Sequence, residues 1–211
     1  MSKVNSRTKL LDYLERQEYL KTSEVRRAME KVDREAFVRT SDRASAYDDT
    51  HLPIGQGQTI SAPHMVAMML EELRLEKNDN LLEIGSGCGY HAAVASQMVS
   101  KVITIERIKY IYELACKNLE NYNNIEIIHG DGSIGFMDNA PYQKIMVTCG
   151  SPRVPKPLVD QLDFDGLMVI PGGGRVSQEL LTIKRTKGGI EVNRRPGGAF
   201  VPMIGTNAFE S

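Results

Sequence analysis

The amino-acid sequence predicts an α/β protein with a doubly wound, largely parallel sheet. From Asn80 onward, short apolar runs alternate with helical patterns, which is typical of strands joined by right-handed crossover helices. The first apolar run ends in a glycine-rich loop at residues 85–89, directly before a helical pattern. A loop of this kind at a strand–helix junction indicates the ligand crevice of an open α/β sheet.

Composition predicts one soluble globular domain over residues 1–211, with 41% hydrophobic and 25% charged residues. The net charge of −1 lacks the basic field that nucleic-acid binding requires, so we expect no nucleic-acid partner. No apolar run approaches the ~18 residues that cross a bilayer, and the charged N-terminal segment has no apolar signal core. We therefore expect a cytoplasmic protein without a membrane partner.

The three cysteines, Cys88, Cys116 and Cys149, are widely spaced and form no CxxC pair. This pattern disfavours a zinc site and a disulfide framework, so no metal is expected. Cysteine also packs as a small hydrophobe. The three side chains are therefore expected to be buried free thiols.

Residues 1–79 are expected to form N-terminal helices and a lid over the site. Leu10 and Leu14 recur at helical spacing, and Thr22 is a plausible N-cap of a second helix. Residues 51–61 are rich in turn-forming types and predict a loop, after which Pro63 opens a third helix.

Residues 80–211 are expected to form the binding core and the C-terminal strands. The predicted tail is a β-hairpin whose two alternating stretches are joined at Gly188 and Gly189. In chain order, the sequence predicts strands over 81–85, 101–106, 125–132, 142–150 and 167–174, helices over 91–99, 108–119 and 156–162, and the hairpin over 179–195.

The glycine loop favours S-adenosyl-L-methionine (SAM) over a nicotinamide dinucleotide. Its spacing is GxGxG, and Tyr90 occupies the place of the last glycine in the dinucleotide pattern GxGxxG. Glu83, two positions before the loop, would repel a pyrophosphate but suits the ammonium and sulfonium of SAM. An ordinary tight turn is the alternative interpretation of the loop.

Acidic residues also follow the next two predicted strands. Glu106 ends the second strand, where a carboxylate can accept from both ribose hydroxyls. Asp131 and Gly132 end the third strand, where a side chain can reach an adenine amino group. Each acid alone could be a solvated strand-end residue, but three successive strand ends together favour a nucleoside site.

The segment before the third helix leaves alternatives open for two residues. Ser61 is either the N-cap of that helix or a functional side chain, and His64 is either a surface or capping residue of its first turn or a ligand contact. No serine lies in a GxSxG elbow, which disfavours a Ser-His-Asp hydrolase. The fourth strand is not followed by an NPPY-type tetrapeptide, which disfavours a base-flipping methyltransferase.

The segments GQTISAPHM, LLEIGSGCGYHAA, VITIER, HGDGSIGF and VPKPLVDQL, in this order, resemble those of protein-L-isoaspartate O-methyltransferases over about residues 10–205. The resemblance implies a Rossmann-like SAM-dependent methyltransferase fold, with N-terminal helices and a C-terminal β-hairpin. It implies methyl transfer from SAM to the α-carboxylate of L-isoaspartyl residues in damaged proteins and peptides, which initiates repair through a succinimide. We expect the enzyme to be a monomer.

The resemblance also implies a role for each matching residue. Ser61 matches the active-site serine, and Ile60, Val201 and Pro202 are expected to contact the substrate together with it. The expected cofactor-binding residues are Gln58, Thr59, His64, Glu83, Gly85, Ser86, Gly87, Gly89, Glu106, Arg107, Asp131 and Gly132.

Three other functions compete with this hypothesis. A SAM-dependent enzyme of the same fold could act on a small molecule or on RNA. A SAM-binding module that has lost catalysis could serve as an interaction protein. An NAD oxidoreductase is disfavoured by the GxGxG spacing and by Glu83.

Overall fold

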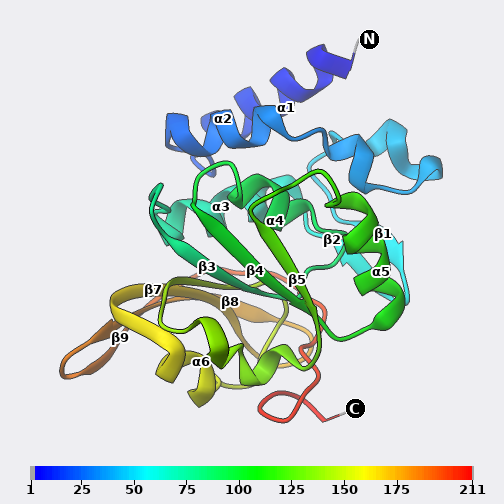
Figure 1. Ribbon diagram of the computed structural model, residues 1–211. Helices are drawn as coiled ribbons and strands as arrows, with labels where there is room; N and C mark the ends of the chain where they lie inside the picture. The colour runs from blue at the N-terminus through cyan, green and yellow to red at the C-terminus, as the bar shows by residue number, and fades with distance from the viewer. Residues whose placement is uncertain (1–2, 211) are drawn as a thin grey trace.

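A computed structural model describes residues 3–210 and confirms the α/β fold (Figure 1). The described residues form a seven-stranded sheet in the order β5-β4-β3-β6-β7-β8-β9. The strands from β3 to β7 run parallel, whereas β8 and β9 pair antiparallel. The bounds are β3 Asn80–Ile84, β4 Lys101–Glu106, β5 Ile125–His129, β6 Tyr142–Val147, β7 Leu162–Gly173, β8 Gln178–Thr186 and β9 Gly189–Arg195.

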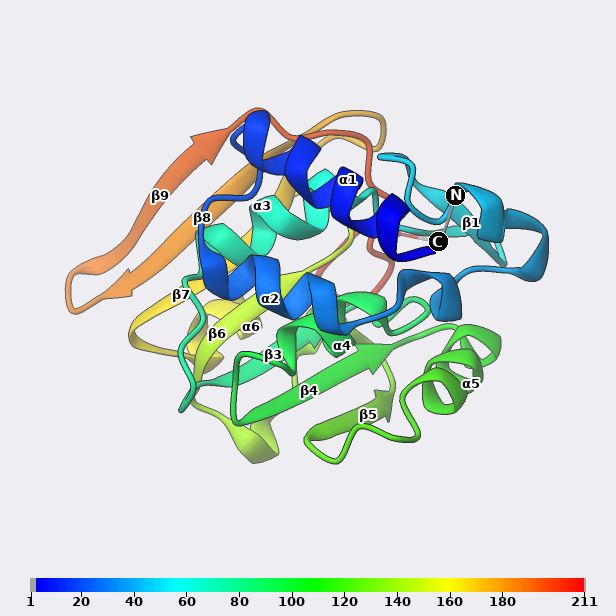
Figure 2. The same cartoon turned by 90° about the horizontal axis from the view of Figure 1, so that it is seen from above.

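Helices cover both faces of the sheet, as Figures 1 and 2 show. The helices α3, α4 and α5 pack on one face, α1 and α2 lie outside α3 and α4, and α6 lies on the other face. Their bounds are α1 Lys3–Arg16, α2 Ser23–Lys31, α3 Pro63–Leu73, α4 Tyr90–Ala95, α5 Lys109–Asn118 and α6 Lys156–Gln161, with 3-10 turns η1 Arg34–Phe37, η2 Thr40–Ser45, η3 Gly132–Ile134 and η4 Met137–Asn139.

The central strands are apolar because both of their faces are buried. Successive side chains of a strand point to opposite faces, so Leu81 packs with the α3 and α4 side while Leu82 packs with the α6 side. Both leucines are fully buried. A continuous apolar run, rather than an alternating one, is the pattern that such a two-sided parallel strand requires.

The strand order reverses around β3, and this reversal determines where the ligand crevice lies. The chain first adds β4 and β5 on one side of β3 and then returns to add β6 on the other side. The register pairs Ile84 with Ile105 of β4 and with Val147 of β6, so the carboxyl ends of these three strands lie together. This reversal is the usual binding position of an open α/β sheet.

The lid segment is a β-hairpin, so the expectation of an irregular loop over residues 51–61 was wrong. The strands β1 (Leu52–Gly55) and β2 (Gln58–Ile60) pair antiparallel through a two-residue turn. Both turn residues, Gln56 and Gly57, have positive φ angles of 52° and 70°. This is the backbone of a type I′ hairpin turn, in which glycine is favoured at the second position.

The C-terminal hairpin is confirmed as β8 and β9, but its turn lies one residue earlier than expected. Thr186 pairs with Gly189, so Lys187 and Gly188 are the two turn residues. The helix after the glycine loop is also shorter than predicted, because α4 ends at Ala95 and Ser96 donates its hydroxyl back to the Ala93 carbonyl at 2.7 Å.

Two of the three cysteines, Cys88 and Cys149, are buried free thiols, whereas Cys116 is only half-buried. Within residues 3–210, no three histidine, cysteine or acidic side chains gather as a metal site would require. No helix in that range combines the length and the apolar character needed to cross a membrane.

Candidate active site

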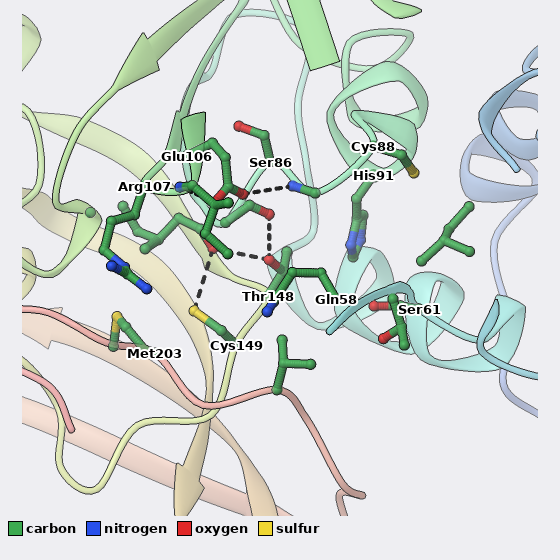
Figure 3. A pocket seen from close by; sticks show the side chains of 18 of the residues that line it. Gln58, Ser61, Ser86, Cys88, His91, Glu106, Arg107, Thr148, Cys149 and Met203 are labelled. Atoms are coloured by element: carbon green, nitrogen blue, oxygen red, sulfur yellow. Dashed lines mark hydrogen bonds between the residues drawn. The ribbon is translucent and has the colours of Figure 1, made fainter. Parts of the chain in front are cut away.

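A cavity opens at the carboxyl ends of β3, β4 and β6, where the strand order reverses (Figure 3). The hairpin lid and the C-terminal segment close its other sides. The lining residues that the sequence predicted are Gln58, Thr59, Ile60, Ser61, Gly85, Ser86, Gly87, Glu106, Arg107, Gly132, Val201 and Pro202. The structure therefore brings together residues from five separate parts of the chain.

The glycine loop follows β3 and approaches the end of β6 closely. Gly85 has a φ angle of 93°, and a Cβ atom there would lie 2.6 Å from the hydroxyl oxygen of Thr148. That hydroxyl donates to the Gly85 carbonyl at 2.6 Å. Glycine is therefore required at this position for its backbone angle and for the close approach of the two strand ends.

Glu106 at the end of β4 lines the cavity beside the glycine loop. Its carboxylate accepts hydrogen bonds from the backbone N–H groups of Gly87 at 3.1 Å and of Ile108 at 2.9 Å. Each carboxylate oxygen has a second lone pair. Glu106 is thus held in place by the backbone and can still accept from a vicinal diol.

Glu83 does not line the cavity. Its side chain is therefore not in a position to make the direct contact with the ammonium of a cofactor that the sequence had predicted. Its side chain is fully buried and accepts from the Thr104 hydroxyl at 2.5 Å, and Thr104 in turn lies 2.7 Å from the Ser86 hydroxyl. Burial, with a further contribution from the charge of Glu106, raises the pKa of Glu83 to about 8. Glu83 therefore supports the loop from beneath through Thr104 and Ser86.

Asp131 is also outside the cavity lining, although the neighbouring Gly132 is part of it. Its carboxylate accepts from the Ser133 N–H at 2.9 Å and from the N–H and hydroxyl of Thr206 at 2.8 and 2.9 Å. Partial burial acts against ionisation, but the hydrogen bonds from Thr206 and Ser133 lower the pKa of Asp131. The residue expected on adenine instead ties the C-terminal segment to the end of β5.

Ser61 lines the cavity at the end of the lid hairpin and does not cap the next helix. Ala62 is the N-cap of α3, which begins at Pro63 and has no side-chain cap. The Ser61 carbonyl accepts a hydrogen bond from the guanidinium of Arg34 at 2.8 Å. Of the two alternatives for Ser61, the structure excludes the capping role and fixes the backbone of the residue through Arg34.

Two other residues with a predicted cofactor contact, His64 and Gly89, are not brought to the cavity. His64 lies 2.9 Å from the carboxylate of Asp49 through its ring nitrogen Nδ1, and its ring packs on Tyr19. Gly89 is the N-cap of α4 with a φ angle of 89°, and a Cβ atom there would meet Leu119 at 2.8 Å. His64 therefore stabilises the start of α3, and Gly89 allows α4 to pack on α5.

The C-terminal segment reaches the cavity by pairing with Gly150, which lies three residues after the end of β6. Gly150 donates to the Val201 carbonyl at 2.9 Å and accepts from the Met203 N–H at 2.8 Å. These bonds form a parallel bridge that carries Val201 and Pro202 to the cavity wall. Both residues were predicted to contact the substrate.

The sequence predictions missed several residues of the cavity wall. Thr148 and Cys149 follow β6, so the same strand-end argument that identified Glu106 could have found them. His91 lines the cavity from α4, and no sequence signal separated it from a packed core histidine. Arg34, which is buried behind Ser61, lies in the charged N-terminal segment, for which the sequence predicted helices and no site residue.

The residues of the cavity fit the chemistry of SAM. Glu106 and the glycine-loop backbone supply acceptors and donors for a ribose and for an amino-acid group. Ile84, Ile105 and Ile108 form an apolar part of the cavity wall, which suits an adenine ring. The glycine loop, free of side chains at Gly87, lets a ligand approach the backbone.

Comparisons with known proteins agree with this geometry. A family described as protein-L-isoaspartate(D-aspartate) O-methyltransferase matches residues 5–208. A relative named protein-L-isoaspartate O-methyltransferase from Methanothermobacter thermautotrophicus is 47% identical over 214 residues, which cover 98% of this chain and 99% of the relative. A second, named protein-L-isoaspartate O-methyltransferase 1, from Archaeoglobus fulgidus, is 48% identical over 195 residues, which cover 89% of this chain and 88% of the relative.

A solved structure extends the similarity to the fold. It is described as a protein-L-isoaspartate O-methyltransferase from Plasmodium falciparum in complex with S-adenosyl-L-homocysteine (SAH), and it superimposes with a TM-score of 0.83 at 27% sequence identity. The match covers 94% of this chain and 98% of that chain. With a family match over nearly its whole length and relatives above 45% identity, this chain belongs to the protein-L-isoaspartate(D-aspartate) O-methyltransferase family.

Proposed function

We propose that this protein transfers a methyl group from SAM to the α-carboxylate of L-isoaspartyl residues in damaged proteins and peptides. The observation that carries the proposal is one cavity shared by the glycine loop, Glu106 and Ser61. The first two are suited to hold a nucleoside cofactor, and the third lies on the lid that covers it. Family membership supports the same reaction.

Methyl transfer to a carboxylate depends on the alignment of the two reactants more than on acid–base catalysis. A carboxylate with an ordinary pKa near 4 is already ionised at neutral pH, so no general base is required. When bound, SAM supplies an activated methyl group on a sulfonium. The task of the protein is to hold the carboxylate in line with that methyl group, which can contribute about 7–11 kcal/mol in favourable cases.

Each part of the cavity has a distinct task in this proposal. Glu106 accepts from the ribose hydroxyls and orients the cofactor, while the backbone of the glycine loop binds its amino-acid end. Ser61 donates its hydroxyl to the substrate carboxylate and orients it. Val201 aligns the substrate peptide, because its segment is already bonded to Gly150 at the cavity wall.

The lid hairpin completes the site by excluding water. Gln58, Thr59 and Ile60 all line the cavity from β2, so the hairpin covers the place where the two reactants meet. Removing water leaves the carboxylate less solvated and more reactive. The neighbouring backbone nitrogen attacks the carbonyl of the methyl ester and expels methanol, which forms a succinimide. The succinimide then hydrolyses in part to normal aspartate without help from the protein.

The direct test uses methyl-labelled SAM and a matched pair of peptides that differ only in an isoaspartyl or a normal aspartyl residue. We expect base-labile label only on the isoaspartyl peptide. Label on the aspartyl peptide, base-stable label, label on RNA, or SAM binding without transfer would each contradict the proposal. The last three outcomes would select the rival functions that the sequence left open.

The assembly and the cellular location of the enzyme are part of the proposal. We propose a monomeric cytoplasmic enzyme, because its substrates are damaged proteins and a single chain already brings the glycine loop, Glu106 and Ser61 to one cavity. Light scattering on the purified protein measures the first property. Fractionation of the source cells followed by activity measurements checks the second, and activity confined to a membrane fraction would contradict it.

A further inference from the structure

His91 is a buried polar side chain of the cavity wall that the proposed mechanism leaves without a task. It lies in the first turn of α4, is only 6% exposed and lines the cavity. Neither of its ring nitrogens has a hydrogen-bond partner among the described residues. A buried polar group without a partner costs about 1–3 kcal/mol, so a ligand that supplies a partner is favoured at this position.

The ring lies toward the Ser61 end of the cavity. Figure 3 shows His91 between the start of α4 and Ser61, with Glu106 and Arg107 toward the opposite side. Arg34 interacts with both His91 and Ser61. Its guanidinium donates a hydrogen bond to the Ser61 carbonyl, and its positive charge disfavours protonation of the His91 ring. His91 therefore lies on the side where the substrate carboxylate, rather than the ribose, is expected.

The surroundings keep this imidazole neutral. Burial, together with the positive charge of Arg34, lowers the pKa of His91 to about 3. The backbone of Val66 is the one neighbour that favours the charged form, and it does not reach hydrogen-bonding geometry with the ring. A neutral imidazole donates from one nitrogen and accepts at the other.

We propose that His91 is a substrate-positioning residue, and that its single ring N–H donates a hydrogen bond to the isoaspartyl α-carboxylate beside Ser61. The proposal rests on the proposed function. A neutral donor orients the carboxylate without forming an ion pair, so the carboxylate keeps more of its nucleophilicity. It also adds no positive charge next to the sulfonium that donates the methyl group.

Two substitutions separate hydrogen bonding from packing. His91→Leu keeps similar volume but removes the donor, and His91→Gln keeps a neutral donor. We expect His91→Leu to weaken isoaspartyl-peptide binding to the enzyme–SAH complex about tenfold to a hundredfold, the factor of a hydrogen bond to a charged group. SAH affinity should stay within about twofold, and His91→Gln should recover most of the peptide affinity. The control is Gln17→Leu, which places a leucine at an exposed position outside the cavity lining.

Calorimetry measures both affinities, and nitrogen NMR of the wild-type imidazole gives an answer even if a variant unfolds. Adding the isoaspartyl peptide to the enzyme–SAH complex should shift the His91 ring resonances, whereas the aspartyl peptide should not. Unchanged resonances, or an unchanged peptide affinity in His91→Leu, would overturn the role of His91 alone. A loss of SAH affinity equal to the loss of peptide affinity would also overturn it. A wild-type enzyme that fails to methylate the isoaspartyl peptide would overturn the proposed function itself.

Discussion

The carboxylate of Glu106 accepts a hydrogen bond from the backbone N–H of Gly87 at 3.1 Å, which joins the end of β4 to the glycine loop after β3. Gly87 and Glu106, which lie 19 residues apart in the sequence, are therefore joined directly in the cavity wall. The other carboxylate oxygen accepts from Ile108 at the start of α5. An acid held by two backbone donors is fixed before a ligand arrives, which reduces the conformational entropy that binding must overcome.

We predict that Glu106→Gln weakens SAH binding by about tenfold to a hundredfold. Both carboxylate oxygens of Glu106 accept backbone N–H groups, so an amide would turn one N–H donor toward another and would also remove the charge that strengthens bonds to ribose hydroxyls. Hydrogen bonds to charged groups contribute about 1.5–3 kcal/mol, which corresponds to this range. Calorimetry with SAH measures the change. Glu126→Gln on β5 removes an exposed carboxylate paired with Lys101 and should bind SAH like the wild type.

We predict that Ser61→Ala lowers kcat for an isoaspartyl peptide about tenfold or more while the SAH affinity changes little. The hydroxyl does not cap α3, so its loss should leave the helix and the lid in place. Steady-state kinetics and SAH calorimetry separate the two effects, with the exposed Ser177→Ala as the control. Equal losses of turnover and SAH affinity would mean that Ser61 maintains the lid structure instead.

Glu83 should make the stability of the protein depend on pH in an unusual direction. Its pKa is raised to about 8 in the folded protein, against about 4.3 for an ordinary glutamate. Between these values the folded state holds one more proton than the unfolded state, so the free energy of unfolding contributed by Glu83 decreases as pH rises. Below about pH 4 the residue contributes no such dependence, and above about pH 8 its contribution levels off.

The variant Glu83→Gln tests this dependence, because it keeps an acceptor for Thr104 but cannot ionise. From about pH 5 to about pH 8, its free energy of unfolding should rise relative to the wild type by up to roughly 1 kcal/mol per pH unit. Urea unfolding at a series of pH values provides the measurement. A difference between the two proteins that stays constant across this range would show that Glu83 is ionised in the folded state.

The sequence predicted the parallel core well because its strands are mostly apolar and each predicted run is closed by a glycine or an acid. Leu81 to Ile84, Glu106 and the glycine loop all follow this local rule. The lid hairpin was missed for the opposite reason. Its strands β1 and β2 have only four and three residues, too few for a clear alternation, and the Gln56-Gly57 turn resembled irregular loop sequence.

The side chains of the site were harder to predict than its backbone. Position after a strand does not say whether an acid faces the cavity, and Asp131 illustrates this because Thr206, 75 residues later, occupies its carboxylate. The burial of Glu83 and Arg34 likewise depends on partners that are distant in sequence. Such contacts arise from tertiary packing, for which local periodicity carries no signal.

We predict that Gly85→Ala destabilises the protein by about 1–3 kcal/mol and abolishes most SAH binding. An alanine would have to adopt a φ angle of 93°, and its Cβ atom would meet the Thr148 hydroxyl at 2.6 Å. Relief of that clash would move the end of β6 away from the glycine loop and break the bond from Thr148 to the Gly85 carbonyl.

Gly174→Ala is the matched control, since its added Cβ atom has no neighbour within 4 Å and its backbone is not in the left-handed region. Thermal unfolding and SAH calorimetry should therefore separate the two alanine variants. If Gly85→Ala binds SAH as tightly as Gly174→Ala does, the close approach of β3 and β6 does not shape the cofactor site, and the cavity would have to bind its nucleoside through the Glu106 side alone.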